Sequence, residues 1–207
     1  MQIVDCEQGS EEWFRARLGI PTASEFSTVL AQGRGGAKSI GRRTYLMKLA
    51  GEILTGEPME PITNTHMERG KIMQEEARSF YEAMSGETVV QIGFIRNGQT
   101  GCSPDGLIKM VGALEIKTAL PHILGEILLR DEFPFEHRAQ CQGVLWVAER
   151  EWIDLVIYWP RMPTFVKRAY RDDVFIAHLS EEVDRFNEEL QKTVELIRRA
   201  GWHHDRG

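Results

Sequence analysis

Two short runs of sequence, Cys102-Ser103-Pro104-Asp105-Gly106-Leu107 and Leu114-Glu115-Ile116-Lys117, carry most of the information about the fold. The Pro-Asp-Gly in the first run is typical of a turn that enters a strand, and the second run has the apolar alternation of a strand. Side chains two positions apart on a strand point to the same face, so Glu115 and Lys117 project together. A hairpin between the two strands would return Asp105 to the side of Glu115.

This arrangement predicts a metal-dependent hydrolytic site. Two carboxylates with a backbone carbonyl nearby form an oxygen site suited to Mg²⁺. A metal held there activates a water molecule and stabilises the charge on a phosphodiester under attack. Lys117 would orient or deprotonate that water, or neutralise the transition state. The alternative is an ordinary salt-bridged strand face, and the Ser-Pro-Asp-Gly turn at the right distance upstream favours the catalytic interpretation.

The composition is that of an ordinary globular protein. The chain has 207 residues, 42% of them apolar, which is the size of one domain. We expect no membrane span, because no apolar run approaches the roughly 18 residues required, and no signal peptide. Three cysteines without a Cys-x-x-Cys spacing predict neither a disulfide framework nor a zinc site, and indicate a cytosolic protein. The formal charge of −6 argues by itself against nucleic acid as a partner.

Periodicity and breakers predict an α/β single domain in which a central mixed sheet is flanked by helices. We divide it into a helical N-terminal part at 10–86, a catalytic sheet with helices at 87–170, and a C-terminal helix at 180–200 with Ser180 as its cap. Other helices are expected at 10–18 with Ser10 as the cap, 22–33, 41–54, 64–84, 121–130 and 136–148. Strands are expected at 88–91, 93–96, 107–110, 113–118, 152–159 and 165–170.

Four ordered motifs resemble those of the phage lambda exonuclease family, the YqaJ-like viral recombinases of the PD-(D/E)xK nuclease superfamily. Asp105 followed by Glu115-Ile116-Lys117 is similar to the superfamily signature. The other three are 13–20 with 22–25, Gly70 with 75–78, and 137–142 leading into Leu145-Trp146-Val147. His137 stands where Tyr is more usual in the family. The resemblance covers about residues 13 to 150 and implies a restriction-endonuclease-like core.

Carried over to this sequence, the resemblance implies roles for individual residues. Asp105 and Glu115 would be metal ligands, with the backbone carbonyl of Ile116 completing the site. Lys117 would activate the water or stabilise charge, and Gln140 would orient the nucleophile or a metal-bound water. The family's pocket for the 5′-phosphate of the degraded strand corresponds to Arg17, Ser24 and Ser103, and a guanidinium fork with hydroxyls suits a phosphate dianion.

Two departures from the family pattern bear on the number of metals. The family's acidic helix has Glu four positions after the glycine, where this chain has Gln74, so either the Gln74 amide oxygen or Glu75 would serve. Asn97 stands where some relatives have an upstream acid. We therefore expect one firm Mg²⁺ site, with Mn²⁺ able to substitute, and leave a second site open. Met67 is a candidate wedge for the terminal base pair. The cations of the glycine-rich loop, Arg34 and Lys38, are candidates for DNA contact, with core packing and solvation as the alternatives.

By resemblance the function is that of an alkaline-type, processive 5′→3′ exodeoxyribonuclease on double-stranded DNA ends. It would release 5′-mononucleotides and leave 3′ single-stranded tails for a strand-annealing protein in phage-type recombination. Family members form ring-shaped homotrimers and act in the cytoplasm of a bacterial host. The alternatives are an endonuclease or RecB-like repair nuclease of the same fold, and a catalytically weakened DNA-end-binding protein. Acids committed to metal then account for part of the negative charge, because bound Mg²⁺ inverts the local field.

Overall fold

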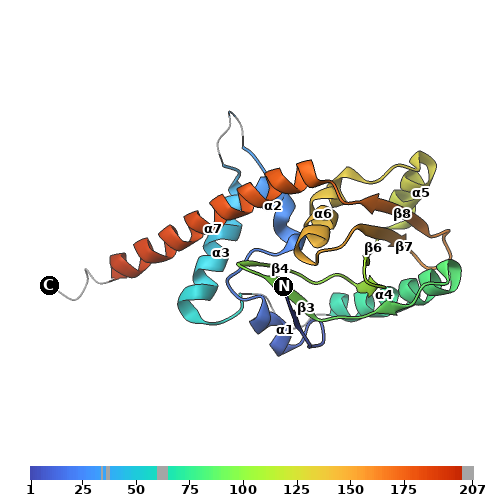
Figure 1. Cartoon of the computed structure of the whole chain (residues 1–207), viewed down its shortest axis with the longest axis horizontal. Helices are drawn as coiled ribbons and strands as arrows, with labels where there is room; N and C mark the ends of the chain where they lie inside the picture. The colour runs from blue at the N-terminus through green and yellow to red at the C-terminus, as the bar shows by residue number, and fades with distance from the viewer. Residues whose placement is uncertain (34, 36–37, 60–64, 202–207) are drawn as a thin grey trace.

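A five-stranded mixed sheet lies at the centre of the chain in this computed structural model, which describes residues 1–33, 35, 38–59 and 65–201, without the side chains of 65–69 and 201 (Figure 1). Its strand order is β2-β5-β6-β7-β8. The central pair, β6 and β7, is parallel, and the other neighbours are antiparallel. The strands are β2 (Val89–Val90), β5 (Gly106–Ile108), β6 (Gly112–Thr118), β7 (Trp152–Tyr158) and β8 (Phe165–Tyr170).

A second, antiparallel sheet has the order β1-β3-β4, with β1 at Gln2–Val4, β3 at Phe94–Asn97 and β4 at Thr100–Cys102. The turn between β3 and β4 begins at the predicted Asn97-Gly98, and Gly98 has a φ of 61°, which glycine adopts at low cost. The sequence did not predict β1 or β4. Strands of three residues are too short to show an alternating pattern, and β1 forms only by pairing with β3 far along the chain.

Helices cover both faces of the central sheet, as predicted (Figure 1). One face is covered by α4, and α6 lies on the other, with α2, α3 and α7 packed beyond it. The helices are α1 (Glu11–Ala16), the 3₁₀ helix η1 (Ala23–Glu25), α2 (Phe26–Leu30), α3 (Ile40–Thr55), α4 (Thr65–Ser85), α5 (Pro121–Arg130), the 3₁₀ helix η3 (Phe135–His137), α6 (Arg138–Val147) and α7 (Asp173–Gly201).

Alternation along the strands divides the core into two clusters. Ala113 of β6 and Leu155 of β7 belong to the larger cluster, on the side of α6 and α7. Leu114 and Ile116 belong to a smaller cluster with Ala77 of α4. Each face of β6 is therefore packed against a different helix, which fixes the register that places Glu115 and Lys117.

A buried polar network also joins α4 to the sheet. The Tyr81 hydroxyl of α4 donates to Asp154 Oδ2 at 2.6 Å. Arg168 of β8 grips the same carboxylate with two bonds of 2.8 Å and stacks on the Trp152 ring, with its guanidinium carbon 3.6 Å from the ring centroid. The bidentate, charge-assisted contact joins β8 to β7 and holds the carboxylate to which α4 is bonded through Tyr81.

Some predicted helix boundaries were wrong. The C-terminal helix begins at Asp173 instead of Ser180, because Asp172 Oδ1 accepts from the Phe175 N–H and the apolar stripe extends back to Ile176. Ser180 lies inside that helix, where its hydroxyl donates to the Ala177 carbonyl. The helix expected at 22–33 is a 3₁₀ turn followed by α2, and ends at Leu30.

Other boundaries were predicted well. The Ser10 hydroxyl caps α1 by accepting from the Trp13 N–H at 3.2 Å, as expected.

Within the described part of the chain, none of the helices has both the length and the apolar character that crossing a membrane requires.

Candidate active site

The β5–β6 hairpin places Asp105 beside β6, as the sequence predicted. Gly106 lies opposite Leu114, and the Asp105 N–H extends the ladder by donating to the Leu114 carbonyl at 3.0 Å. The Asp105 side chain then reaches along β6, where its Oδ2 accepts from the Ile116 N–H at 2.6 Å. The acid is therefore held by the backbone of the strand that carries the second acid.

Glu115 and Lys117 share one face of β6, and Gln140 reaches them from α6. Lys117 Nζ lies 2.8 Å from Glu115 Oε1, and the Gln140 amide donates to the same oxygen. Glu115 is buried, whereas the Lys117 side chain is 30% exposed. The other carboxylate oxygen, Glu115 Oε2, is buried, and none of the described residues donates a hydrogen bond to it. A buried, unsatisfied carboxylate oxygen is costly, so this atom calls for a cation or a water.

The electrostatics of the acid pair point to the same need. Burial, and then the charge of Glu115, raise the pKa of the Asp105 carboxyl to about 8, against the opposing effects of the Ile116 N–H, Lys117 and Arg78. Burial alone would lower the pKa of Lys117, but the charge and hydrogen bond of Glu115 outweigh it, so the pKa is raised. Lys117 is thus a stable cation, and further positive charge beside Asp105 would favour the ionised form of its carboxyl.

The donor set fits one hard divalent cation. Asp105 and Glu115 offer carboxylate oxygens, Ile116 lines the same cavity, and the orphaned Glu115 Oε2 is available as a ligand. No group of three His, Cys, Asp or Glu side chains with metal-binding geometry occurs among the described residues, so amide, carbonyl or water oxygens would complete the shell.

The two candidates on the acidic helix are placed differently. Gln74 Nε2 donates to Asp105 Oδ1 at 3.1 Å, so this side chain faces the acid pair. Glu75 is exposed and lines a neighbouring cavity, without lining the one that holds Glu115.

All three residues predicted to bind a 5′-phosphate line the same cavity as the acid pair, which has a volume of about 200 Å³. Arg17 Nη2 donates to Thr22 Oγ1 at 3.2 Å, and that hydroxyl lies 3.2 Å from Ser24 Oγ. Ser103 stands on the Ser-Pro-Asp-Gly turn, two residues before Asp105. A cation and hydroxyls therefore gather at one end of the cavity, and the acid pair lies in the same cavity.

Among the described residues that line this cavity, three with hydrogen-bonding side chains were not predicted as site residues. Trp13 Nε1 donates to Ser103 Oγ at 2.8 Å, and the Arg17 guanidinium carbon lies 4.0 Å from the centre of the Trp13 ring. Thr22 links Arg17 to Ser24. Gln8 donates to the carbonyls of Ile92 and Pro104, both at 3.0 Å, and so braces the turn that carries Asp105. Trp13 and Thr22 belong to quoted motifs, but their contacts depend on tertiary structure.

The remaining candidates lie elsewhere. Lys38 forms a 2.6 Å ion pair with Glu189 of α7 and does not line this cavity. Asn97 donates to the Val147 carbonyl at 3.3 Å and does not line it either. Arg34 lies outside the described residues. Met67 is in α4, but its side chain also lies outside the description.

Comparison with known proteins places the chain in a family. Residues 12–151 match the YqaJ-like viral recombinase domain. The structure of an alkaline exonuclease from Laribacter hongkongensis, LHK-Exo, is 33% identical, with 94% of this chain and 99% of that chain covered and a TM-score of 0.84, and its complex with dAMP matches equally well. A phage-related exonuclease from Haemophilus somnus 129PT shares the fold at 13% identity, with 86% and 96% of the two chains covered and a TM-score of 0.66.

Among proteins with curated descriptions, none matches this sequence. The family match spans more than half of the chain and includes all four motifs described above. The 33%-identical structure extends the similarity over almost the whole chain. The chain therefore belongs to the YqaJ-like viral recombinase family.

Proposed function

We propose that this protein is a Mg²⁺-dependent, processive 5′→3′ exonuclease that degrades one strand of double-stranded DNA from an end. It releases 5′-mononucleotides and leaves 3′ single-stranded tails. Family membership and the 33%-identical alkaline exonuclease support a nuclease, and the dAMP complex of that relative supports a mononucleotide product. The observation that carries the polarity is the single cavity that contains both the acid pair and the Arg17, Ser24 and Ser103 cluster.

Each residue has a defined part in this reaction. Asp105, Glu115 and the Ile116 carbonyl hold the cation, which when bound polarises the scissile phosphate and lowers the pKa of the attacking water. Lys117, kept protonated by Glu115, donates to that water or to the charged oxygens of the transition state. Gln140, already in hydrogen-bond contact with Glu115, orients the water. Because a water molecule is the attacking group, no side chain of the protein has to form a covalent intermediate.

The phosphate end of the cavity explains direction and step size. Arg17, with the Ser24 and Ser103 hydroxyls, binds the terminal 5′-phosphate by charge-assisted hydrogen bonds. Hydrolysis between the first and second nucleotides creates a new 5′-phosphate, which can occupy the same position after an advance of one nucleotide. A 3′ end carries no phosphate to bind there, so the strand is degraded from its 5′ end.

The wider setting follows from the family. We propose a ring-shaped homotrimer that encloses the duplex, which makes processivity independent of tight DNA contacts. The 3′ tails would pass to a single-strand annealing protein in the cytoplasm of a bacterial host. Enclosure also reconciles a net charge of −6 with a DNA substrate, because acids can lie on the outer surface. The mass of the protein in solution tests the trimer.

One experiment tests activity, polarity and metal dependence together. Linear duplex labelled at the 5′ or the 3′ end is incubated with Mg²⁺, with Mn²⁺ or with a chelator. We expect labelled mononucleotide from the 5′ label at the earliest times, a shortening strand from the 3′ label, slower or comparable cleavage with Mn²⁺, and no cleavage with chelator. Efficient cutting of closed circular plasmid would instead identify an endonuclease.

A second candidate, a DNA-end-binding protein without nuclease activity, is motivated by Gln74, which replaces an acid expected on α4 and contacts Asp105 as a donor. In the same experiment, labelled duplex that is bound and stays intact with Mg²⁺ would establish this function and refute the exonuclease.

A further inference from the structure

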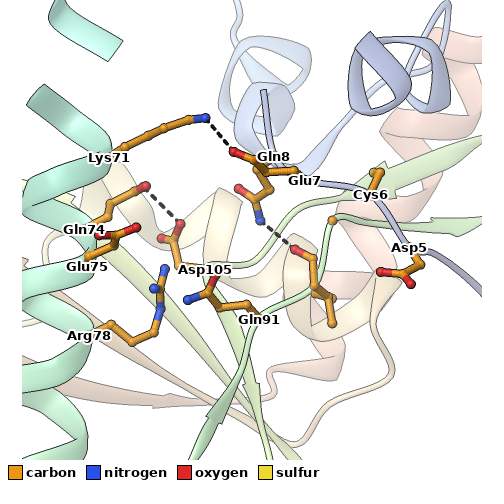
Figure 2. A pocket seen from close by; sticks show the side chains of 12 residues that line it. Asp5, Cys6, Glu7, Gln8, Lys71, Gln74, Glu75, Arg78, Gln91 and Asp105 are labelled. Carbon is orange, nitrogen blue, oxygen red and sulfur yellow. Dashed lines mark hydrogen bonds and ion pairs between the residues drawn. The ribbon is translucent and has the colours of Figure 1, made fainter. Parts of the chain in front are cut away.

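A second cavity, of about 160 Å³, is drawn in Figure 2, and Asp105 lines both this cavity and the one that holds the proposed phosphate pocket. Its walls are the N-terminal loop 5–8, one face of α4 and the loop 91–93 before β3. Gln8, Gln74 and Asp105 line both cavities, so the two spaces meet at Asp105. A DNA strand bound in one cavity can therefore continue past Asp105 into the other.

Arg78 is the distinctive group in this second cavity. It is half-buried on α4, two turns after Lys71, and Figure 2 shows it pointing toward Asp105 and Gln91. Its Nε–H is buried, and no described residue accepts a hydrogen bond from it. A buried guanidinium donor without an acceptor is costly, and the geometry of the guanidinium suits a phosphate oxygen pair.

Of the two described cations that line the cavity, Lys71 has an ion-pair partner in it, so Arg78 is the one we consider for binding an anionic ligand. Lys71 is already paired with Glu7 at 3.1 Å, and both side chains are well exposed. Glu75 and Asp5 add negative charge to the lining, so the cavity is not a broad basic track. A site of this composition favours one anionic group in direct contact with Arg78 over a long stretch of backbone.

We propose that Arg78 binds the phosphate immediately 3′ of the scissile phosphate, and so holds the strand on both sides of the bond being cleaved. Adjacent phosphates of one strand are a single nucleotide apart. With the terminal phosphate at Arg17 and the scissile phosphate at Asp105 and Glu115, the next phosphate can enter the adjoining cavity, which Arg78 and Asp105 both line. Binding of the phosphates on both sides of the scissile phosphate, by Arg17 and by Arg78, would position the scissile phosphate for in-line attack. This inference rests on the proposed exonuclease function.

A neutral phosphate analogue tests the contact. A 5′-labelled, 5′-phosphorylated duplex carries one methylphosphonate between nucleotides 2 and 3, and the single-turnover rate of release of the first nucleotide is measured. This rate reports only the first cleavage, in which the modified linkage is not the scissile one. A second duplex has the methylphosphonate between nucleotides 8 and 9. The proteins are the intact chain, Arg78→Gln, Arg78→Lys, and Lys71→Gln as the control cation from the same cavity.

We expect the modification between nucleotides 2 and 3 to slow the intact protein and Lys71→Gln by about tenfold, the value for one charge-assisted hydrogen bond. Arg78→Gln should be slowed about as much on unmodified DNA, with little further loss on the analogue. Arg78→Lys keeps the charge but loses the two parallel donors of the guanidinium. Its rate on unmodified DNA should lie between those of the intact protein and Arg78→Gln, and the methylphosphonate between nucleotides 2 and 3 should still slow it. Its sensitivity is a second readout should Arg78→Gln fold poorly.

Other results overturn the inference. The first is an Arg78→Gln variant that the methylphosphonate between nucleotides 2 and 3 slows as much as it slows the intact protein. The second is an intact protein whose rate this methylphosphonate does not change. The third is a rate loss from the methylphosphonate between nucleotides 8 and 9 that depends on Arg78. Failure of the exonuclease function itself would be distinct, because the intact protein would then release no nucleotide from unmodified DNA.

Discussion

Two buried carboxylates lie on neighbouring strands of the central sheet, on opposite faces, and their surroundings differ. Asp154, on the α4 face, has both oxygens satisfied by Arg168 and a further bond from Tyr81. Glu115, on the α6 face, receives Lys117 and Gln140 on one oxygen and leaves the other without a partner. Both side chains are almost fully buried.

We propose that the difference separates a carboxylate that stabilises the fold from one that is kept for chemistry. A satisfied buried ion pair locks an element in place, and removing one partner leaves an uncompensated charge. An unsatisfied buried oxygen destabilises the protein by itself and persists where a ligand or reaction uses it. Mutations at the two acids should therefore have opposite consequences for stability and cleavage.

Glu115→Gln should give the largest effect of all on activity. It removes a proposed metal ligand, so the rate of cleavage with Mg²⁺ should fall by about 10³-fold or more. The free energy of unfolding should stay within about 1 kcal/mol or rise, because a buried charge is lost. Single-turnover cleavage and denaturant unfolding measure the two. Retained cleavage, or a clear loss of stability, would refute the contrast.

Asp154→Asn should show the opposite pattern. It should lower the free energy of unfolding by about 2–3 kcal/mol, which is less than for a fully buried pair because the Arg168 side chain is 39% exposed and can be solvated. Cleavage per folded molecule should be nearly unchanged below the unfolding transition. A large loss of activity in the fully folded variant would show that the α4 face takes part in the chemistry.

The place of Glu115 in a cluster of charged residues could be predicted from the sequence, whereas the place of Asp154 could not. Asp105, Glu115 and Lys117 are close in sequence, and the geometry of a hairpin is enough to bring them together. Asp154 and Arg168 sit on two strands whose pairing the sequence does not specify.

Tertiary contacts also decide the features that were predicted poorly. Strand β1 exists only because β3 is available to pair with it, and Thr22 reaches Arg17 only because the chain turns between them, where Gly19 has a φ of 70°. The start of α7 was misplaced because Ser180 resembles a cap as strongly as Asp172 does, and only the packing of Ile176 and Leu179 selects the earlier start. The local sequence pattern thus predicted the strand that carries Glu115 and Lys117, while long-range packing determined the elements around it.

Arg17 and Arg168 extend the comparison to cations, since each stacks on a tryptophan ring. Arg168 grips a carboxylate of the fold, whereas we expect Arg17 to bind the terminal phosphate of DNA. The intact protein should degrade 5′-phosphate ends about tenfold faster than 5′-hydroxyl ends, the effect of one charge-assisted contact. In Arg17→Ala this ratio should fall toward one.

The matched control for Arg17→Ala is Arg15→Ala. Arg15 lies in the last turn of α1, two residues before Arg17, where it is exposed and pairs with Glu11. Its substitution should leave the ratio between the two ends unchanged. Equal rates on both ends in the intact protein would remove the case for a 5′-phosphate pocket.

Tyr81→Phe should give the smallest effect and is the finest test of the α4 face. Burial, and then Asp154, raise the pKa of the Tyr81 hydroxyl, so it remains a donor wherever the protein is folded. Its loss should cost about 1 kcal/mol of unfolding free energy, because Arg168 still satisfies both oxygens of Asp154. Tyr158→Phe, which removes an exposed bond to Glu76, should cost close to nothing. If Tyr81→Phe slowed cleavage without changing the free energy of unfolding, α4 would contribute to the rate of cleavage and not only to stability. The distinction between a stabilising α4 face and a catalytic α6 face would then be wrong.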